Sequence, residues 1–326
     1  MRVGSAAPLV VALALGAAPL LAQPEPASGN AALTIEEITV IGRYPGPPLW
    51  KVTSGEHTLW IFGELRPVPK GLEWDPRNAQ RVLERADAVI GAPRISAPTF
   101  NPFKVFRLLR DARRLTRLAD GKTLADVLPP DLDARYEALH ARYLPKDRRD
   151  DDLRPALAVL RLYGAALGAV GLTADSNVGN EVKRLMRRSH AEESAPRIKT
   201  EPETVLDALG RVTREAELAC FATVLTSIET DLEGMKERAN AWATGDVAAL
   251  RRLDYPDSQG DCLRMLFSSS GIATLRDELY AMWLAEAERA LATRRTTFSV
   301  LPMRELVAAD GLLARLAARG YAVTAP

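Results

Sequence analysis

The chain has 326 residues, of which 47% are hydrophobic and 26% are charged, and a formal net charge of +1. This composition is typical of a folded globular protein, and no low-complexity tract interrupts it. Because the opposing charges almost cancel, the net charge gives no reason to expect nucleic acid as a partner.

The first 22 residues have the pattern of a secretory signal peptide. Arg2 gives a short basic start, an apolar run covers 6–21, and Ala22 precedes a polar segment that contains proline. The run is short for a membrane span and lies next to the terminus, which favours cleavage after Ala22 over the alternative of an uncleaved anchor helix. No later apolar run is long enough to cross a bilayer. We therefore expect a periplasmic or secreted protein with no membrane span after signal cleavage.

A linker and then one domain are expected after the signal. Residues 23–48 are rich in Pro and Gly and contain one short strand-like run at 37–41. A single domain is predicted for 49–324, and most of its middle, 101–295, has the apolar spacing of helices.

The domain starts with a predicted hairpin. Its two strands, 49–52 and 58–62, are separated by a turn-rich stretch that includes Gly55. The second strand ends at Gly63, where a glycine lets the chain bend so that the following side chains project into a pocket. A helix with Asp75 as its N-cap is predicted next.

The two cysteines, Cys220 and Cys262, both fall in predicted helices. In an exported chain they meet oxidising conditions, which favours a disulfide between them. Two buried free thiols are the alternative, since the sequence does not give the distance between their Cα atoms.

The C-terminal end repeats the pattern of the first motif. A hydrophobic strand, 298–301, runs into Pro302 and then Glu305, and Asp310-Gly311-Leu312 follows. Taken together, Gly63 to Arg66 and this C-terminal stretch resemble the TraB/PrgY/GumN family, whose Tiki members are metal-dependent proteases. The resemblance covers 49–323 and is closest to the GumN-like branch, which lies among exopolysaccharide functions.

The resemblance implies a fold and a site. The fold is α+β: a small central mixed sheet from the N- and C-terminal strands, covered by a large, mostly helical middle region. Each motif strand in the family ends in Gly-x-x-His. Here Gly63 is followed by Glu64 and Arg66, and the second motif, aligned through Gly311, has Pro302 at the glycine and Glu305 at the histidine.

Two further family positions are also altered. Residues 86–92 resemble the family's next strand, which commonly ends in a glutamate. This chain has Gly91 or Ala92 at that position. An arginine-asparagine pair of the last large helix would fall near Leu279 and Tyr280, which match neither residue. The family implies a divalent metal, but its imidazole ligands are missing, so no cofactor is expected.

The substitutions themselves suggest a new contact. Arg66 carries a permanent positive charge and does not bind a cation, whereas Glu305 is able to. If the two strand ends meet, Arg66 would face Glu305 and form a charge-assisted pair at the former metal position. The site would then be a structural clamp or an anion-binding pocket.

Two functions follow from the residues and the resemblance. The preferred one is a non-catalytic, degenerate family member that serves as a binding or accessory module at the cell envelope, with an unknown envelope protein or polysaccharide as partner. The alternative is a protease-like or glycosidase-like hydrolase in which Glu64 and Glu305 act as paired carboxylates. Whether the chain is an enzyme stays open at this point.

Overall fold

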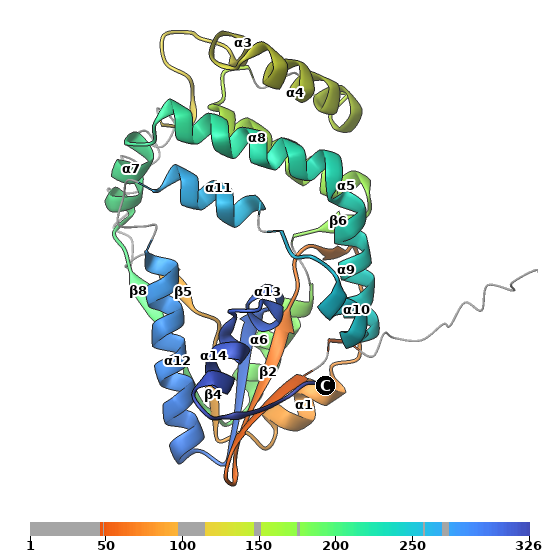
Figure 1. The fold of residues 1–326 in the computed structure, drawn as a ribbon, viewed down its shortest axis with the longest axis vertical. Helices are drawn as coiled ribbons and strands as arrows, with labels where there is room; N and C mark the ends of the chain where they lie inside the picture. The colour runs from red at the N-terminus through yellow and green to blue at the C-terminus, as the bar shows by residue number, and fades with distance from the viewer. Residues whose placement is uncertain are drawn as a thin grey trace, which may run out of the picture. The chain divides into compact units, whose positions relative to one another are not determined.

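Among the described residues, a six-stranded mixed sheet organises the fold (Figure 1). The computed structural model describes residues 46–47, 49–96, 115–146, 151–174, 177–256, 258–268 and 274–326, so the expected signal peptide, its cleavage position and most of the linker lie outside the described residues. In spatial order the strands are β10 (Ala322–Thr324), β1 (Leu49–Ser54), β2 (His57–Glu64), β9 (Thr296–Pro302), β4 (Ala88–Ile90) and β7 (Glu192–Ser194).

The strand directions make the sheet mixed. β1 runs antiparallel to both β2 and β10, whereas β2, β9, β4 and β7 run parallel to one another. The predicted hairpin is confirmed and is tighter than expected, since Ser54 pairs with His57 and only Gly55 and Glu56 form the turn. Gly55 has a φ of 56°, a left-handed conformation that glycine adopts without strain.

The α+β fold with N- and C-terminal strands in one sheet is confirmed. The mostly helical middle is also confirmed, although short strands interrupt it and one of them, β7, joins the main sheet. The other described strands form two small sheets: β3 (Val68–Pro69) with β6 (Leu172–Thr173), and β5 (Arg94–Ser96) with β8 (Arg197–Lys199).

Helices account for most of the rest of the described chain. In chain order they are α1 (Arg77–Leu83), α3 (Leu124–Val127), α4 (Pro130–Tyr143), α5 (Pro155–Ala169), α6 (Asn177–Arg188), α7 (Pro202–Gly210), α8 (Arg214–Thr230), α9 (Leu232–Thr244), α10 (Val247–Arg252), α11 (Ser258–Leu266), α12 (Leu275–Thr293), α13 (Met303–Val307) and α14 (Leu312–Ala318). The first of these begins one residue later than predicted, although Asp75 still accepts a hydrogen bond from the Arg77 backbone N–H at 3.0 Å. None of the helices in these ranges has the length and apolar character needed to cross a membrane.

Helices cover both faces of the sheet, which explains why every residue of β9 from Thr297 to Leu301 is buried. Side chains of a strand alternate between faces. On one face, Ser299 accepts a hydrogen bond at 3.0 Å from the indole Nε1 of Trp283 in α12. On the other face, Phe62 and Val300 lie beside α6. The residues after Glu64 therefore emerge between two helical layers.

α4, α5, α8 and α11 form a layer beyond the carboxyl ends of β2 and β9, whereas α12, the longest described helix, lies alongside the sheet (Figure 1). α8 packs against α5 and α11 in this layer, and α9 follows α8 directly. One buried hydrogen bond ties it to the sheet: Trp242 of α9 donates its indole N–H to the carbonyl oxygen of Gly63 at 2.7 Å. This contact fixes the distance between the end of β2 and the helical layer.

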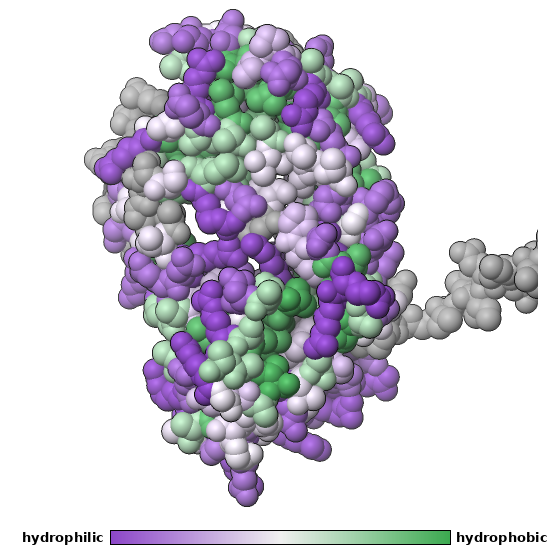
Figure 2. All heavy atoms as spheres, viewed as in Figure 1, coloured by the Kyte–Doolittle hydropathy of each residue, from purple (hydrophilic) through white to green (hydrophobic). Residues whose placement is uncertain are grey.

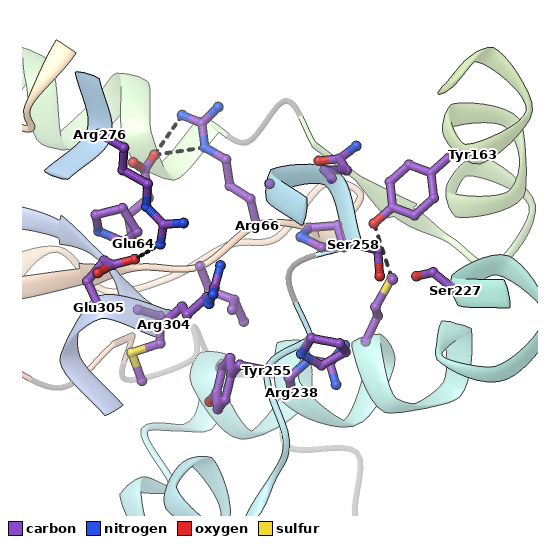
Figure 3. A pocket seen from close by; sticks show the side chains of 18 of the residues that line it. Glu64, Arg66, Tyr163, Ser227, Arg238, Tyr255, Ser258, Arg276, Arg304 and Glu305 are labelled. Carbon is purple, nitrogen blue, oxygen red and sulfur yellow. Dashed lines mark hydrogen bonds and ion pairs between the residues drawn. The ribbon is translucent and has the colours of Figure 1, made fainter. Parts of the chain in front are cut away.

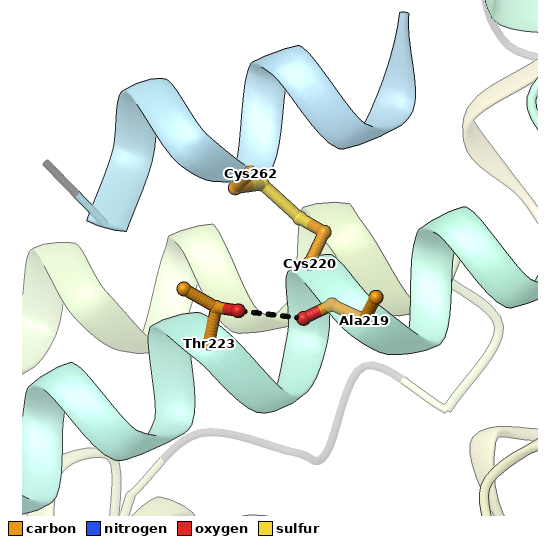
Figure 4. Close-up of a disulfide and its surroundings, with 4 residues drawn as sticks. All are labelled: Ala219, Cys220, Thr223 and Cys262. Carbon is orange, nitrogen blue, oxygen red and sulfur yellow. Dashed lines mark hydrogen bonds between the residues drawn. A yellow bond between two sulfur atoms is a disulfide. The ribbon is translucent and has the colours of Figure 1, made fainter. Parts of the chain in front are cut away.

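A disulfide joins two helices of that layer. Cys220 of α8 and Cys262 of α11 are bonded, with their Cα atoms 4.3 Å apart and a sequence separation of 42 (Figure 4). The predicted disulfide is therefore confirmed, and both cysteines are fully buried. The bond holds α11 against α8, close to the carboxyl edge of the sheet.

Candidate functional site

The two motif stretches meet at one edge of the sheet. β2 and β9 are parallel and in register, so that Gly63 pairs with Leu301 and Glu64 pairs with Pro302. The prediction that the two strand ends lie together is confirmed. The carboxyl ends of parallel strands are the usual position of binding sites in such sheets.

A cavity of about 410 Å³ opens at this edge, and we call it the edge cavity. Figure 2 shows a hollow in the middle of the viewed face, with hydrophilic side chains gathered around it between the helices and the sheet. Its described walls come from the ends of β2 and β9, from the loops that follow β2 and α10, and from six helices, α5, α8, α9, α11, α12 and α13. The charged and hydroxyl-bearing residues among the described lining are Glu64, Arg66, Tyr163, Ser227, Arg238, Tyr255, Ser258, Arg276, Tyr280, Arg304 and Glu305.

Arg66 turns back to its own motif. Its Nη2 lies 2.7 Å from Oε1 of Glu64, and its Nε donates to the same oxygen at 3.2 Å (Figure 3). The Glu64 carboxylate also lies against the first turn of α6, because a Cβ on Gly179 would come within 2.4 Å of Oε1. Negative charge at a helix start is stabilised by the backbone dipoles, and α6 has no acidic residue of its own in its first turn.

Glu305 has a different partner from the one we expected. Its carboxylate accepts a short hydrogen bond from Nη2 of Arg276, which α12 places one turn before Tyr280 (Figure 3). Burial lowers the pKa of Arg276, but the hydrogen bond and charge of Glu305 outweigh it, so that the pKa is raised overall. The predicted Arg66–Glu305 pair is wrong, since each of the two residues forms its ion pair with another residue.

A third ion pair stabilises the helical wall. Arg238 of α9 binds both carboxylate oxygens of Asp231, at 3.0 and 2.6 Å, and also donates to the carbonyl oxygen of Asp254 at 2.8 Å. Its side chain is only 8% exposed. A buried, bidentate guanidinium of this kind has a fixed orientation, so this wall of the edge cavity is preorganised.

Hydroxyl groups make up the far side of the cavity. Burial raises the pKa of Tyr163 to about 12, and the charge of Asp231 adds to this effect. Burial also raises the pKa of Tyr255 to about 12. Both phenols are therefore neutral at physiological pH and able to donate hydrogen bonds. The Oγ of Ser227 and the hydroxyl of Tyr255 are buried and have no hydrogen-bond partner within the described protein.

The residues of the edge cavity do not fit the metal that the family implies. Catalytic zinc sites use imidazole and carboxylate ligands. His57 bonds the Arg294 carbonyl oxygen at 2.7 Å instead, and His140 packs in α4 with its ring 5.7 Å from that of Tyr136. Neither these histidines nor His190 lies among the described residues that line the cavity. The two carboxylates that remain, Glu64 and Glu305, are each bound to an arginine.

The Glu64–Arg66 pair also lines a second cavity. This cavity has a volume of about 470 Å³, and its remaining walls include Lys183 and Arg187 of α6. The pair thus stands between two hollows at the same sheet edge. Its arginine side chain is 47% exposed, so water reaches it.

The most informative residues of the site were not predicted from the sequence. Arg276 could have been found, since it lies four residues before Tyr280 and so on the same helical face, close to where the family's arginine was sought. Ser227 gave no such signal, because its helix carries several other hydroxyl residues. Pro302 caps α13, and Gly311 caps α14, so these two motif residues act on the backbone.

One of three comparisons with known proteins identifies a family for the chain. The family model described as the TraB/PrgY/gumN family matches residues 48–325. No curated protein and no solved structure matches the chain. Because the matched stretch contains both motif strands, the edge cavity and nearly all described residues, the protein belongs to the TraB/PrgY/gumN family.

Proposed function

We propose that the protein is a non-catalytic, GumN-like member of its family, a binding or accessory module at the cell envelope that holds a ligand in the edge cavity. The observation that carries this proposal is the pairing of both motif carboxylates with arginines: Glu64 with Arg66 and Glu305 with Arg276. The envelope location is supported by the signal-peptide pattern of the first 22 residues.

The ion pairs argue against the family's metal chemistry in this chain. Where the resemblance places two histidines, the chain has Arg66 and Glu305. A metal hydrolase needs ligands that can donate a lone pair to the ion, and a guanidinium has none. An arginine in this position instead favours anions.

The second candidate is a hydrolase that uses two carboxylates, and it has one observation in its favour: Glu64 and Glu305 line the same cavity. Glycoside hydrolases need one such group as a proton donor and the other as a base or nucleophile. In this site Arg66 donates a hydrogen bond to Glu64, and Arg276 donates one to Glu305. Each guanidinium occupies a carboxylate oxygen that would have to carry the transferable proton. We therefore rank this function second.

Turnover assays with three matched variants distinguish the two candidates. The mature protein would be incubated with a peptide library and an oligosaccharide library, with and without added Zn²⁺, Mn²⁺ or Co²⁺, and products would be measured by mass spectrometry. We expect no product above the buffer blank from the wild type, Glu64→Gln, Glu305→Gln or the control Glu56→Gln, whose residue is exposed in the hairpin turn. Turnover that persists in the control and is lost in either site variant would establish the hydrolase instead.

Metal analysis of the purified wild type is the second arm. We expect less than stoichiometric divalent metal and no change in melting temperature on adding it. A protein that carries one metal ion per chain, and is destabilised when that ion is removed, would contradict the proposal.

A further inference from the structure

We propose that the edge cavity binds a hydroxylated organic anion of about monosaccharide size, its acidic group at the arginines and its hydroxyl groups at Ser227 and Tyr255. This inference rests on the proposed binding function and adds the chemical class of the ligand. Two independent features carry it: a wall rich in guanidinium groups, and two buried hydroxyls on the same cavity that have no hydrogen-bond partner among the described residues.

Ser227 is the strongest single observation. The residue is 4% exposed, and its Oγ makes no hydrogen bond within the described protein. Hydroxyl residues of the same helix normally bond the carbonyl oxygen one turn earlier: Thr223 donates to Ala219 at 2.9 Å and Thr230 to Thr226 at 2.8 Å. Ser227 instead presents its Oγ to the cavity (Figure 3). A buried hydroxyl left unpaired destabilises the fold, and a ligand that hydrogen-bonds to it offsets this cost.

Tyr255 provides a second hydroxyl on the same cavity. Its ring lies under the Arg238 guanidinium, 5.8 Å from the ring centroid, and so its position is held by the ion pair with Asp231. Its phenol is buried and also lacks a partner among the described residues. Because this phenol stays protonated at neutral pH, it has a proton to donate to a ligand oxygen.

The guanidinium groups of the wall favour an anion even though they are ion-paired, because a guanidinium has five N–H donors and the exposed Arg66 contacts Glu64 through its Nε and Nη2 alone among the described residues. Among the described lining residues there are four arginines and two glutamates: Arg66, Arg238, Arg276, Arg304, Glu64 and Glu305. Guanidinium groups match the planar, two-oxygen geometry of a carboxylate and also bind phosphate. A volume of about 410 Å³ falls in the range of small-molecule sites. A sugar acid or sugar phosphate has an acidic group for the arginines and hydroxyl groups for Ser227 and Tyr255.

Titration calorimetry on the mature protein tests this inference. The probes are D-glucuronate and D-glucose 6-phosphate, with D-glucose, acetate and inorganic phosphate as partial ligands. We expect at least one sugar anion to bind about tenfold more tightly than D-glucose and than its own simple anion. The sugar anion that binds more tightly shows whether the cavity prefers a carboxylate (D-glucuronate) or a phosphate (D-glucose 6-phosphate). Equal affinity for D-glucose, or no binding of either sugar anion at millimolar concentration, would overturn the ligand class.

Variants locate the binding in the cavity. Ser227→Ala and Tyr255→Phe each remove one hydroxyl. Each should lower the affinity for the sugar anion about three- to tenfold, as expected for the loss of one hydrogen bond. The matched controls Ser189→Ala and Tyr143→Phe lie outside the cavity and should not change affinity. Since the Ser227 hydroxyl bonds none of the described residues, Ser227→Ala should melt no lower than the wild type, which separates lost binding from misfolding. Unchanged affinity in both site variants would overturn the inference.

The failure of this inference is distinguishable from failure of the proposed function. If neither sugar anion binds and the turnover assays also stay negative, the ligand class is wrong and the non-catalytic assignment stands. If a sugar anion binds as described and the libraries are also hydrolysed, the ligand class stands and the non-catalytic assignment fails.

Discussion

At the residue scale, Gly63 is a packing residue. The sequence predicted that it would bend the chain, but β2 continues through it to Glu64. A Cβ at this position would lie 2.7 Å from Sδ of Met303 and 2.9 Å from the ring of Trp50. Both neighbours are buried, so neither has room to move away. The glycine is therefore required because α13 packs directly on the backbone of β2.

This close approach predicts opposite effects for two glycine substitutions. Gly63→Ala should lower the free energy of unfolding by about 1–3 kcal/mol, the usual cost of overpacking a core. Gly164→Ala is the control, since that glycine lies within helix α5 and an added Cβ would meet nothing within 4 Å. It should raise the free energy of unfolding by about 0.5–1 kcal/mol through helix propensity. Urea unfolding measures both, and a Gly63→Ala protein as stable as the wild type would refute the packing argument.

The two motif ion pairs should differ in strength because they differ in burial. The Arg276 and Glu305 side chains are 34% and 13% exposed, whereas those of Arg66 and Glu64 are 47% and 17% exposed. In double-mutant cycles to alanine, we expect a coupling energy of about 2 kcal/mol for the first pair and about 0.5 kcal/mol for the second. A third cycle between Arg66 and Glu305 should give no coupling. Coupling in that third cycle larger than in the other two would restore the pairing that the sequence suggested.

At the element scale, the sequence was informative wherever one local rule decides the structure. The hairpin followed from two hydrophobic runs around Gly55, and the meeting of β2 with β9 followed from the family resemblance. The ion-pair partners did not follow, because Arg276 reaches Glu305 only through the packing of α12 on the sheet. Strands as short as β7, with three residues, carry too little alternation to be distinguished from a loop between helices.

The disulfide between α8 and α11 should stabilise both the helical layer and the cavity wall. It closes a loop with a sequence separation of 42, for which the chain-entropy model predicts about 4 kcal/mol. α11 also contributes Ser258 and Gln259 to the edge cavity. We expect the Cys220→Ala/Cys262→Ala variant to lose roughly 2–4 kcal/mol in urea unfolding. The wild type in dithiothreitol is the matched comparison, and its free energy of unfolding should approach that of the variant. Equal stability of oxidised wild type and variant would mean that α11 is held by packing alone.

At the scale of the whole molecule, the sheet is assembled from the two ends of the described chain. β2 pairs with β9 and β1 pairs with β10, although most of the helices lie between these strands in sequence. The helices themselves need only local contacts. Contacts between segments far apart in sequence form slowly, because the loop-closure entropy is lost before they become favourable.

This separation predicts that helices form before the sheet edge closes. After dilution from urea with the disulfide intact, far-UV circular dichroism should recover a large part of its signal before tryptophan fluorescence does, and the fluorescence phase should take roughly milliseconds to seconds. Trp242 is the best reporter, since its indole bonds the Gly63 carbonyl across 179 residues of sequence. In Trp242→Phe the amplitude of the slow fluorescence phase should shrink while the circular dichroism phase is kept. If both signals instead recover together with one rate constant, sheet closure and helix formation are a single event, and the edge cavity forms at the same moment as the helical layer.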